Sequence, residues 1–188
     1  LEYLDLSYNS ISGPLPKPIA QLSSLKHLNL KSNKLNGSLS LELDPQLPNL
    51  EVVNLGYNEF SGVVPDFWLP SSLRELYLAK NNFSGALTQR IGCLSNLEKL
   101  YLGSNNFEDV ISESHLLNLS RLQDLDLSFN SRLEFRFSAD WIPPFQLDFL
   151  SLRNCKVGIN VPKWIQTQKN ISEIDLSATG ISGDISSW

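Results

Sequence analysis

Few side chains in this 188-residue chain could carry out catalysis or redox chemistry. The two histidines, His27 and His115, lie far apart, and the sequence contains no nucleophile-elbow, phosphate-loop, zinc-protease or paired-cysteine motif. Cys93 lies in the apolar stretch RIGCL and Cys155 replaces the asparagine of a recurring motif, whereas a reactive thiol needs exposure and a cationic neighbour. We therefore predict a protein that is not an enzyme, uses no cofactor and keeps both thiols buried.

Four asparagines stand in the Asn-x-Ser pattern that directs N-glycosylation in secreted proteins. The candidate attachment sites are Asn36, Asn82, Asn118 and Asn170. The triplet also arises by chance in chains rich in asparagine and serine, so the alternative is that these are ordinary turn residues. Asn36 and Asn82 each neighbour an apolar position of the repeat described next, which should turn their side chains towards solvent. We predict glycosylation at two or more of the four sites.

A repeat of 23 to 25 residues organises the whole chain. The string L-x-x-L-x-L, with Val or Ile at some leucine positions, begins at residues 1, 25, 50, 73, 97, 122, 147 and 171. Apolar residues two positions apart share one face of a strand, so each string predicts a short strand with an apolar inner face. This period is the sequence signature of the leucine-rich repeat, in which neighbouring repeats stack and bury each other's apolar faces.

Asparagine recurs three residues after the last leucine of six of these strings. Its side-chain amide both donates and accepts hydrogen bonds, so it can satisfy backbone groups of a tight buried turn. Stacking would align these side chains into a structural ladder, for which we predict Asn9, Asn33, Asn58, Asn81, Asn105 and Asn130. Cys155 and Thr179 occupy the ladder position in the last two repeats.

The second half of the repeat identifies a subtype. Segments such as ISGPLP at 11–16 and FSGVVP at 60–65 resemble the plant-specific leucine-rich repeat, LxxLxxLxLxxNxLSGxIP. The stretch DWIPPFQL at 140–147, followed by a Pro-x-Trp repeat, is similar to the ectodomains of plant receptor-like proteins, particularly the fungal-xylanase-receptor group. The resemblance implies an α/β-type solenoid: a right-handed leucine-rich-repeat horseshoe with a parallel inner β-sheet and a convex side of irregular or short 3₁₀ segments.

The same resemblance implies a function in recognition outside the cell. Such receptors bind a protein, peptide or glycan ligand, in defence a microbial elicitor, and signal through a receptor-like kinase adaptor or co-receptor. The alternatives that share this repeat are a secreted inhibitor of the polygalacturonase-inhibiting type and the ectodomain of a receptor-like kinase. Because neither end shows a capping repeat, we expect residues 1–188 to be a fragment of a longer ectodomain on the extracellular side of the plasma membrane.

Charge and hydropathy argue against two kinds of partner. Twenty acidic residues against fifteen basic ones give a net charge of −5, which argues against a nucleic-acid-binding surface. No apolar run approaches the roughly 18 residues that span a bilayer, so any membrane contact would use a span outside these residues. The acidic residues Asp124, Asp126, Glu173 and Asp175 could suggest a cation site, but a whole repeat separates the two pairs. We interpret them as a solvated acidic surface and predict no metal site.

The predicted ligand surface is the outward side of the strands, where stacking lines residues into columns. The central column is Asp5, Asn29, Asn54, Tyr77, Tyr101, Asp126, Ser151 and Asp175. Exposed aromatic rings beside small residues have the composition of a binding hot spot, although aromatic residues also simply suit strands. The candidate binding residues, all assigned to outward strand positions, are Tyr57, Tyr77, Lys80, Tyr101, Phe129 and Arg153.

Overall fold

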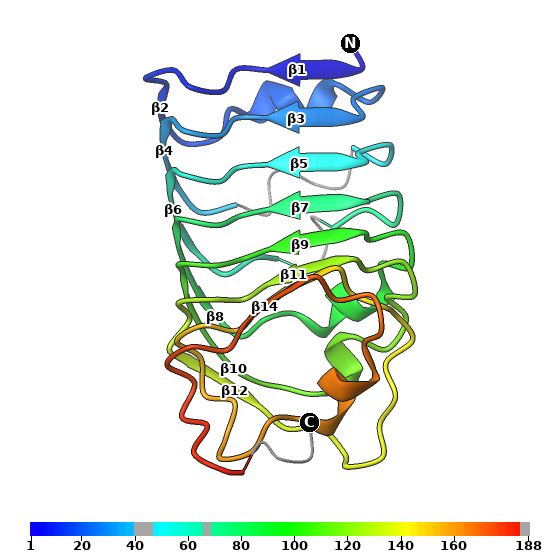
Figure 1. The fold of residues 1–188 in the computed structure, drawn as a ribbon. Coiled ribbons are helices and arrows are strands. Elements are labelled where there is room, and N and C mark those ends of the chain that lie inside the picture. Colours follow the sequence, from blue (N-terminus) through cyan, green and yellow to red (C-terminus); the bar gives the residue numbers. More distant parts are fainter. Residues whose placement is uncertain (40–46, 66–68, 185–188) are drawn as a thin grey trace.

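Eight short strands, one from each repeat, form a single parallel sheet along the chain in the computed structural model, which describes residues 1–39, 47–65 and 69–184. They stack in chain order like the rungs of a ladder (Figure 1). The strands are β1 (Tyr3–Asp5), β3 (His27–Asn29), β5 (Val52–Asn54), β7 (Glu75–Tyr77), β9 (Lys99–Tyr101), β11 (Asp124–Asp126), β13 (Phe149–Ser151) and β14 (Glu173–Asp175). The parallel solenoid predicted from the repeat is confirmed.

The apolar residue at the centre of each strand points into the solenoid. Leu28, Val53, Leu76, Leu100, Leu125 and Leu150 are each no more than 1% exposed, whereas Leu4 and Ile174 in the two outermost strands are only partly buried. Each such burial contributes about 1.5–3 kcal/mol. Because each repeat buries apolar surface only against the repeats on either side, this stabilisation is approximately a sum of nearest-neighbour contacts.

A second parallel sheet runs along one edge of the first, at the left in Figure 1. Its strands are β2 (Ser12–Gly13), β4 (Lys34–Gly37), β6 (Glu59–Gly62), β8 (Asn82–Gly85), β10 (Asn106–Ile111) and β12 (Arg132–Phe135). Gly37, Gly62 and Gly85 end their strands with φ of 80°, 78° and 80°, a conformation that glycine adopts without strain. In the fifth repeat Asp109 replaces this glycine, and β10 continues two residues further, to Ile111.

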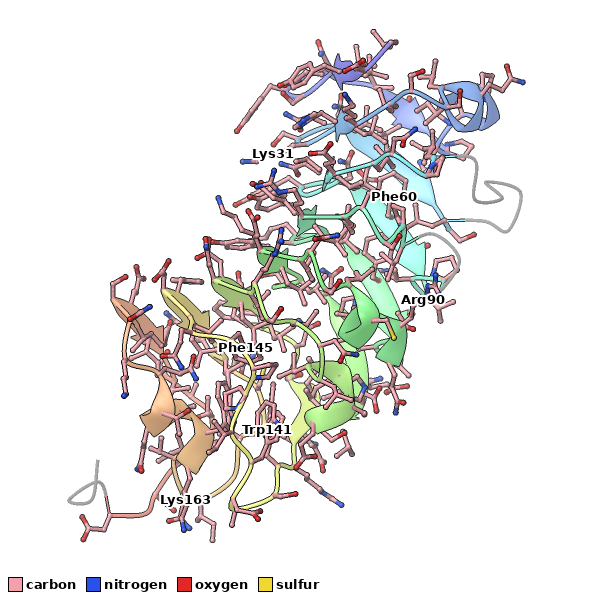
Figure 2. The ribbon with its side chains drawn as sticks, turned by 90° about the vertical axis from the view of Figure 1, so that its right-hand side faces the viewer. Lys31, Phe60, Arg90, Trp141, Phe145 and Lys163 are labelled. Carbon is pink, nitrogen blue, oxygen red and sulfur yellow. The ribbon has the colours of Figure 1, made fainter. Side chains whose placement is uncertain are left out.

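The convex side carries short 3₁₀-helices: η1 (Lys17–Gln21), η3 (Gln89–Cys93), η4 (Glu113–His115) and η5 (Lys163–Thr167). Figure 2 shows Lys31 and Arg90 on opposite sides of the solenoid; Lys31 follows the end of β3, and Arg90 lies on η3. The prediction for Cys93 was wrong: it ends η3 and is exposed, whereas Cys155 is buried. Within the described ranges, no helix has the length and apolar character needed to cross a bilayer.

Five aromatic rings fill the core of the irregular sixth and seventh repeats. Trp164, on η5, is 3% exposed and makes edge-on contacts with Phe137, Trp141 and Phe145 at centroid distances of 5.6, 5.8 and 6.3 Å. Phe135 extends the cluster through Phe137. Figure 2 places Trp141 and Phe145 among these C-terminal turns. These rings pack in the interior where a regular repeat would have its leucine and glycine residues.

Candidate functional site

The ladder asparagines connect each repeat to the one before it. Asn58 Nδ2 donates to the backbone oxygens of Leu30 and Leu55 at 3.0 and 3.1 Å, and Asn58 Oδ1 accepts from the Leu35 amide at 3.0 Å. Asn33, Asn81, Asn105 and Asn130 repeat this arrangement. The carbonyl that follows each of β1, β3, β5, β7 and β9 is therefore occupied by two ladder asparagines, one from its own repeat and one from the next.

The residue before each ladder position adopts a left-handed backbone conformation. Its φ lies between 54° and 61° in all eight repeats, at Tyr8, Ser32, Tyr57, Lys80, Ser104, Phe129, Asn154 and Ala178. The assignment of Tyr57, Lys80 and Phe129 to extended strand positions was therefore wrong, because these residues form the turn that follows the strand. None of the eight is β-branched, and β-branched residues are the ones most strained at positive φ; this was the signal available in the sequence.

The central column has a capping role that sequence reasoning missed. In five repeats its Asp or Asn side chain accepts a hydrogen bond from the backbone amide two residues later, at 2.8–3.2 Å. The capped amides belong to Ser7, Lys31, Gly56, Ser128 and Ser177. Tyr77 and Tyr101 occupy this column in the fourth and fifth repeats and cannot supply such an oxygen. The central column therefore caps a backbone amide in five repeats, whereas in the fourth and fifth repeats it presents tyrosine rings.

Tyr77 and Tyr101 lie side by side on β7 and β9. Their rings stack with centroids 5.2 Å apart, and Tyr101 also stacks on Phe149 at 6.0 Å. The Tyr77 hydroxyl donates to Glu75 at 2.7 Å and the Tyr101 hydroxyl to Asp124 at 3.0 Å. Partial burial, followed by these carboxylate partners, raises the pKa of both phenols above its ordinary value, so both remain neutral donors.

A hollow of about 400 Å³ opens over these rings. It is lined by thirteen residues, among them five of the six predicted binding residues: Tyr57, Tyr77, Lys80, Tyr101 and Phe129. A second hollow of about 240 Å³ shares Asn54 and Tyr77 with the first. The sixth predicted residue, Arg153, does not line either one; its guanidinium lies 5.2 Å from the Phe129 ring centre and 3.8 Å from Asp175.

Two lysines, Lys31 and Lys80, border the hollow. Lys31 Nζ lies between the exposed rings of Tyr8 and Tyr57, at 5.6 and 5.4 Å from their centres, an arrangement that favours a cation. Neither Lys31 nor Lys80 forms an ion pair with any residue in the described parts of the chain, in contrast to Arg74, Lys99 and Arg153. Residues 1–39, 47–65 and 69–184 hold no group of three or more His, Cys, Asp or Glu side chains suited to a metal ion.

The four candidate glycosylation asparagines are all exposed. Asn36 and Asn82 lie on the second sheet, and Asn82 uses only its Oδ1, which accepts from Asn106 at 2.7 Å, so its amide nitrogen is open to solvent. We expect the chain secreted from plant cells to carry glycans at two or more of the four sites, measurable as mass lost on glycosidase treatment. Asn82→Gln should remove one glycan mass, while Asn160→Gln, outside any Asn-x-Ser triplet, should remove none; a chain without any glycan would contradict the expectation.

Comparisons with known proteins agree with this architecture. Residues 1–183 match the family model of the leucine-rich repeat region. Receptor-like protein EIX1 of Solanum lycopersicum is 53% identical over 42% of this chain and 8% of its own length, and Receptor-like protein 39 of Arabidopsis thaliana is 35% identical over 100% of this chain and 24% of its own length.

Solved structures of plant receptors share the fold. The ectodomain of the Arabidopsis receptor kinase HAESA, in complex with an IDA peptide hormone, superposes with a TM-score of 0.81 at 31% identity, covering 94% of this chain and 29% of that chain. A TDR receptor gives 0.80 at 31% identity, covering 94% and 30%. The chain spans less than a third of each of these proteins. The chain belongs to the leucine-rich repeat family, and its relatives there are plant receptor-like proteins.

Proposed function

We propose that this chain is the ligand-recognition segment of a plant cell-surface receptor, exposed on the extracellular side of the plasma membrane. It binds a peptide or protein ligand over the hollow on its concave sheet and performs no catalysis. The observation that carries this proposal is the stacked pair Tyr77 and Tyr101, which replaces capping Asp or Asn residues where sister repeats keep them. The pair gives up a local hydrogen bond to the backbone and presents aromatic surface, the usual anchor of a protein interface.

The relatives support the kind of ligand and partner. HAESA is described in complex with a peptide hormone, and also in complex with that hormone and the co-receptor SERK1. By analogy, this chain would act with a receptor-like kinase as adaptor or co-receptor. The likeness to the receptor-like proteins EIX1 and EIX2, together with the sequence resemblance to the fungal-xylanase-receptor group, favours perception of a microbial elicitor in defence.

A receptor-kinase ectodomain is the second candidate, because HAESA and a TDR receptor are 31% identical to this chain. The concave site would act in the same way in either parent protein. The sequence that follows residue 188 in the gene separates the two: a membrane span with a short tail identifies a receptor-like protein, and a span with a kinase domain identifies a receptor kinase.

Truncation of the tyrosine pair tests the binding face. Peptides selected from a random display library against this chain should lose about tenfold to hundredfold in affinity on Tyr77→Ala or Tyr101→Ala, since buried aromatic anchors contribute about 1–3 kcal/mol each. The double variant should be less than additive, because the stacked rings share one contact patch. Isothermal titration calorimetry measures these affinities.

The control lies on the opposite side of the solenoid. Arg90 on η3 is exposed and of comparable size, so Arg90→Ala should leave peptide affinity unchanged. Stability must be followed in parallel by circular dichroism, because the stacked and partly buried rings give each tyrosine truncation a folding cost of about 1–2 kcal/mol, above the cost of under about 1 kcal/mol expected for a freely exposed strand residue. Selected peptides that bind the double alanine variant as tightly as the original chain would refute the concave site.

A further inference from the structure

Two backbone amides in the hollow, those of Ala79 and Gly103, have no acceptor among the residues that the structure describes. Continuation of the parallel ladder would pair the Ala79 amide with the Leu55 oxygen, but that oxygen already accepts from Asn58 and Asn81. One repeat further, the Leu78 oxygen is occupied in the same way by two ladder asparagines, Asn81 and Asn105, which leaves the Gly103 amide free. Neither amide donates a hydrogen bond to any described residue. A backbone donor that stays partly buried without a partner is costly.

The equivalent amides in other repeats show which kind of atom accepts a hydrogen bond at this position. The equivalent amides of Gly56 and Ser128 donate to Asn54 Oδ1 at 3.1 Å and to Asp126 Oδ1 at 2.9 Å. In each case the acceptor is an amide or carboxylate oxygen on the concave side of the sheet. The fourth and fifth repeats have tyrosine instead, and both phenol groups are turned away to Glu75 and Asp124. A ligand that enters the hollow can therefore supply the oxygen that the protein itself supplies elsewhere.

The two free amides differ in their electrostatic surroundings. Ala79 is followed by Lys80, and Lys31 lines the same hollow; neither lysine has an acidic partner among the residues described. Beside Gly103 lies the Asp126 carboxylate, both of whose oxygens are 2.9 Å from the point where a Cβ on Gly103 would stand. A negatively charged oxygen is thus favoured at Ala79 and disfavoured at Gly103, where a neutral carbonyl oxygen fits.

We propose that the amide of Ala79 and the ammonium group of Lys80 together bind a carboxylate of the ligand, supplied by an Asp or Glu side chain of an extended peptide. A backbone carbonyl of the same peptide accepts from the Gly103 amide. Neighbouring strands are about 4.8 Å apart and an extended chain rises about 3.3 Å per residue, so an acidic side chain and a carbonyl one or two residues away in the same peptide can reach the two amides. This inference rests on the proposed function in that the occupant is the peptide ligand of the concave face.

The direct test uses two blocked tripeptides that differ in one group: acetyl-Ala-Glu-Ala-amide and acetyl-Ala-Gln-Ala-amide. Amide NMR spectra of the isotope-labelled chain should show a saturable shift of the Ala79 resonance with the Glu peptide. The Gln peptide should bind about tenfold more weakly, because it lacks the charge-assisted hydrogen bonds. Glucuronate, added separately, presents a carboxylate on a sugar; tighter binding than the Glu peptide would overturn the peptide assignment.

Substitutions at position 77 test whether the Ala79 amide itself binds the carboxylate. Tyr77→Asn restores the capping side chain of sister repeats, so it should occupy the Ala79 amide and abolish the response to the Glu peptide. Tyr77→Leu removes the same ring but offers no acceptor, so any affinity lost with the ring is common to both variants and only the Leu variant should still show the Ala79 response to the Glu peptide. Lys80→Met, which keeps the length of the side chain, should weaken the Glu peptide about tenfold and bring it level with the Gln peptide.

The outcomes separate this inference from the proposed function. Binding of library peptides through Tyr77 and Tyr101, with no response of the Ala79 amide to the Glu peptide, would overturn the carboxylate position and leave the concave ligand face standing. Equal responses in the Asn and Leu variants at position 77 would overturn it as well. A response that Tyr77→Asn abolishes and Tyr77→Leu retains would support it, even if the library peptides proved to bind on another surface.

Discussion

Replacement of Asn130 by leucine is expected to lower the free energy of unfolding by about 2–5 kcal/mol, although it adds an apolar side chain to the core. Asn130 is fully buried. Its Oδ1 accepts from the Phe107 amide at 3.1 Å, and its Nδ2 donates to the Leu102 and Leu127 oxygens at 3.1 and 2.9 Å. Leucine leaves the Phe107 amide unpaired in the interior and removes two further bonds. Urea denaturation followed by circular dichroism measures the loss.

The same substitution at the first ladder position is the matched control. Asn9 is exposed, and it donates only to the Leu6 and Ser7 oxygens of its own repeat, at 3.1 and 3.2 Å. Water can replace it at both oxygens, so Asn9→Leu should cost under about 1 kcal/mol. Equal losses at the two positions would show that the ladder acts through something other than buried backbone hydrogen bonds.

The ladder and the sheet could be predicted because both follow from the repeat period alone. Side chains at one position of the repeat must coincide in a stack, so their spacing in sequence determines their alignment in space. The departures at Cys155 and Thr179 were visible in the sequence, but the reason for their tolerance was not. The Leu133 amide, from which an asparagine at 155 would accept a hydrogen bond, donates instead to the Asn130 oxygen within the irregular sixth repeat. Cys155 Sγ donates to the Leu127 oxygen at 3.1 Å, as the ladder asparagines do to the equivalent carbonyls.

The character of the concave surface could be predicted only in part. The strand register places Tyr77 opposite Tyr101, as the column assignment required. In the second, third and sixth repeats, the residue of the central column accepts from a backbone amide whose ordinary carbonyl partner is already occupied by ladder asparagines. That occupation involves asparagines of two adjacent repeats, so it cannot be read from the sequence of a single repeat. The left-handed turn at Tyr57, Lys80 and Phe129 was missed for a related reason. The L-x-x-L-x-L string indicates where a strand lies, but these residues come two positions after its last leucine, where the strand has ended and the chain turns.

Trp164 is a buried member of the aromatic cluster of the sixth and seventh repeats, 3% exposed. Its indole meets three other rings nearly edge-on, at interplanar angles of 61°, 66° and 84°. Edge-to-face pairs of this kind add about 0.5–1.5 kcal/mol each beyond the burial of area. This cluster therefore stabilises the part of the chain where the regular repeat, with its glycine and its ladder asparagine, is interrupted.

Trp164→Ala is accordingly expected to cost about 3–5 kcal/mol, because the ring stack around the removed indole cannot collapse into the space it leaves. The change should also weaken the near-ultraviolet circular dichroism of the remaining aromatic residues, which report on their fixed packing. Thermal unfolding of the variant measures the cost. A loss within about 1 kcal/mol would mean that the cluster repacks freely and does not hold the irregular repeats together.

Trp164→Phe distinguishes packing from hydrogen bonding at the same position. The indole Nε1 of Trp164 is buried and has no hydrogen-bond partner in the described parts of the chain, so the native side chain already carries the cost of an unpaired polar group, about 1–3 kcal/mol. Phenylalanine removes that group and keeps an aromatic ring against Phe137, Trp141 and Phe145, at the expense of some volume. The two effects oppose each other, so we expect Trp164→Phe to fall within about 1.5 kcal/mol of the original chain. If phenylalanine is as costly as alanine, the Nε1–H group contributes a bond of its own, and the stability of these repeats depends on that bond as well as on the packing of the rings.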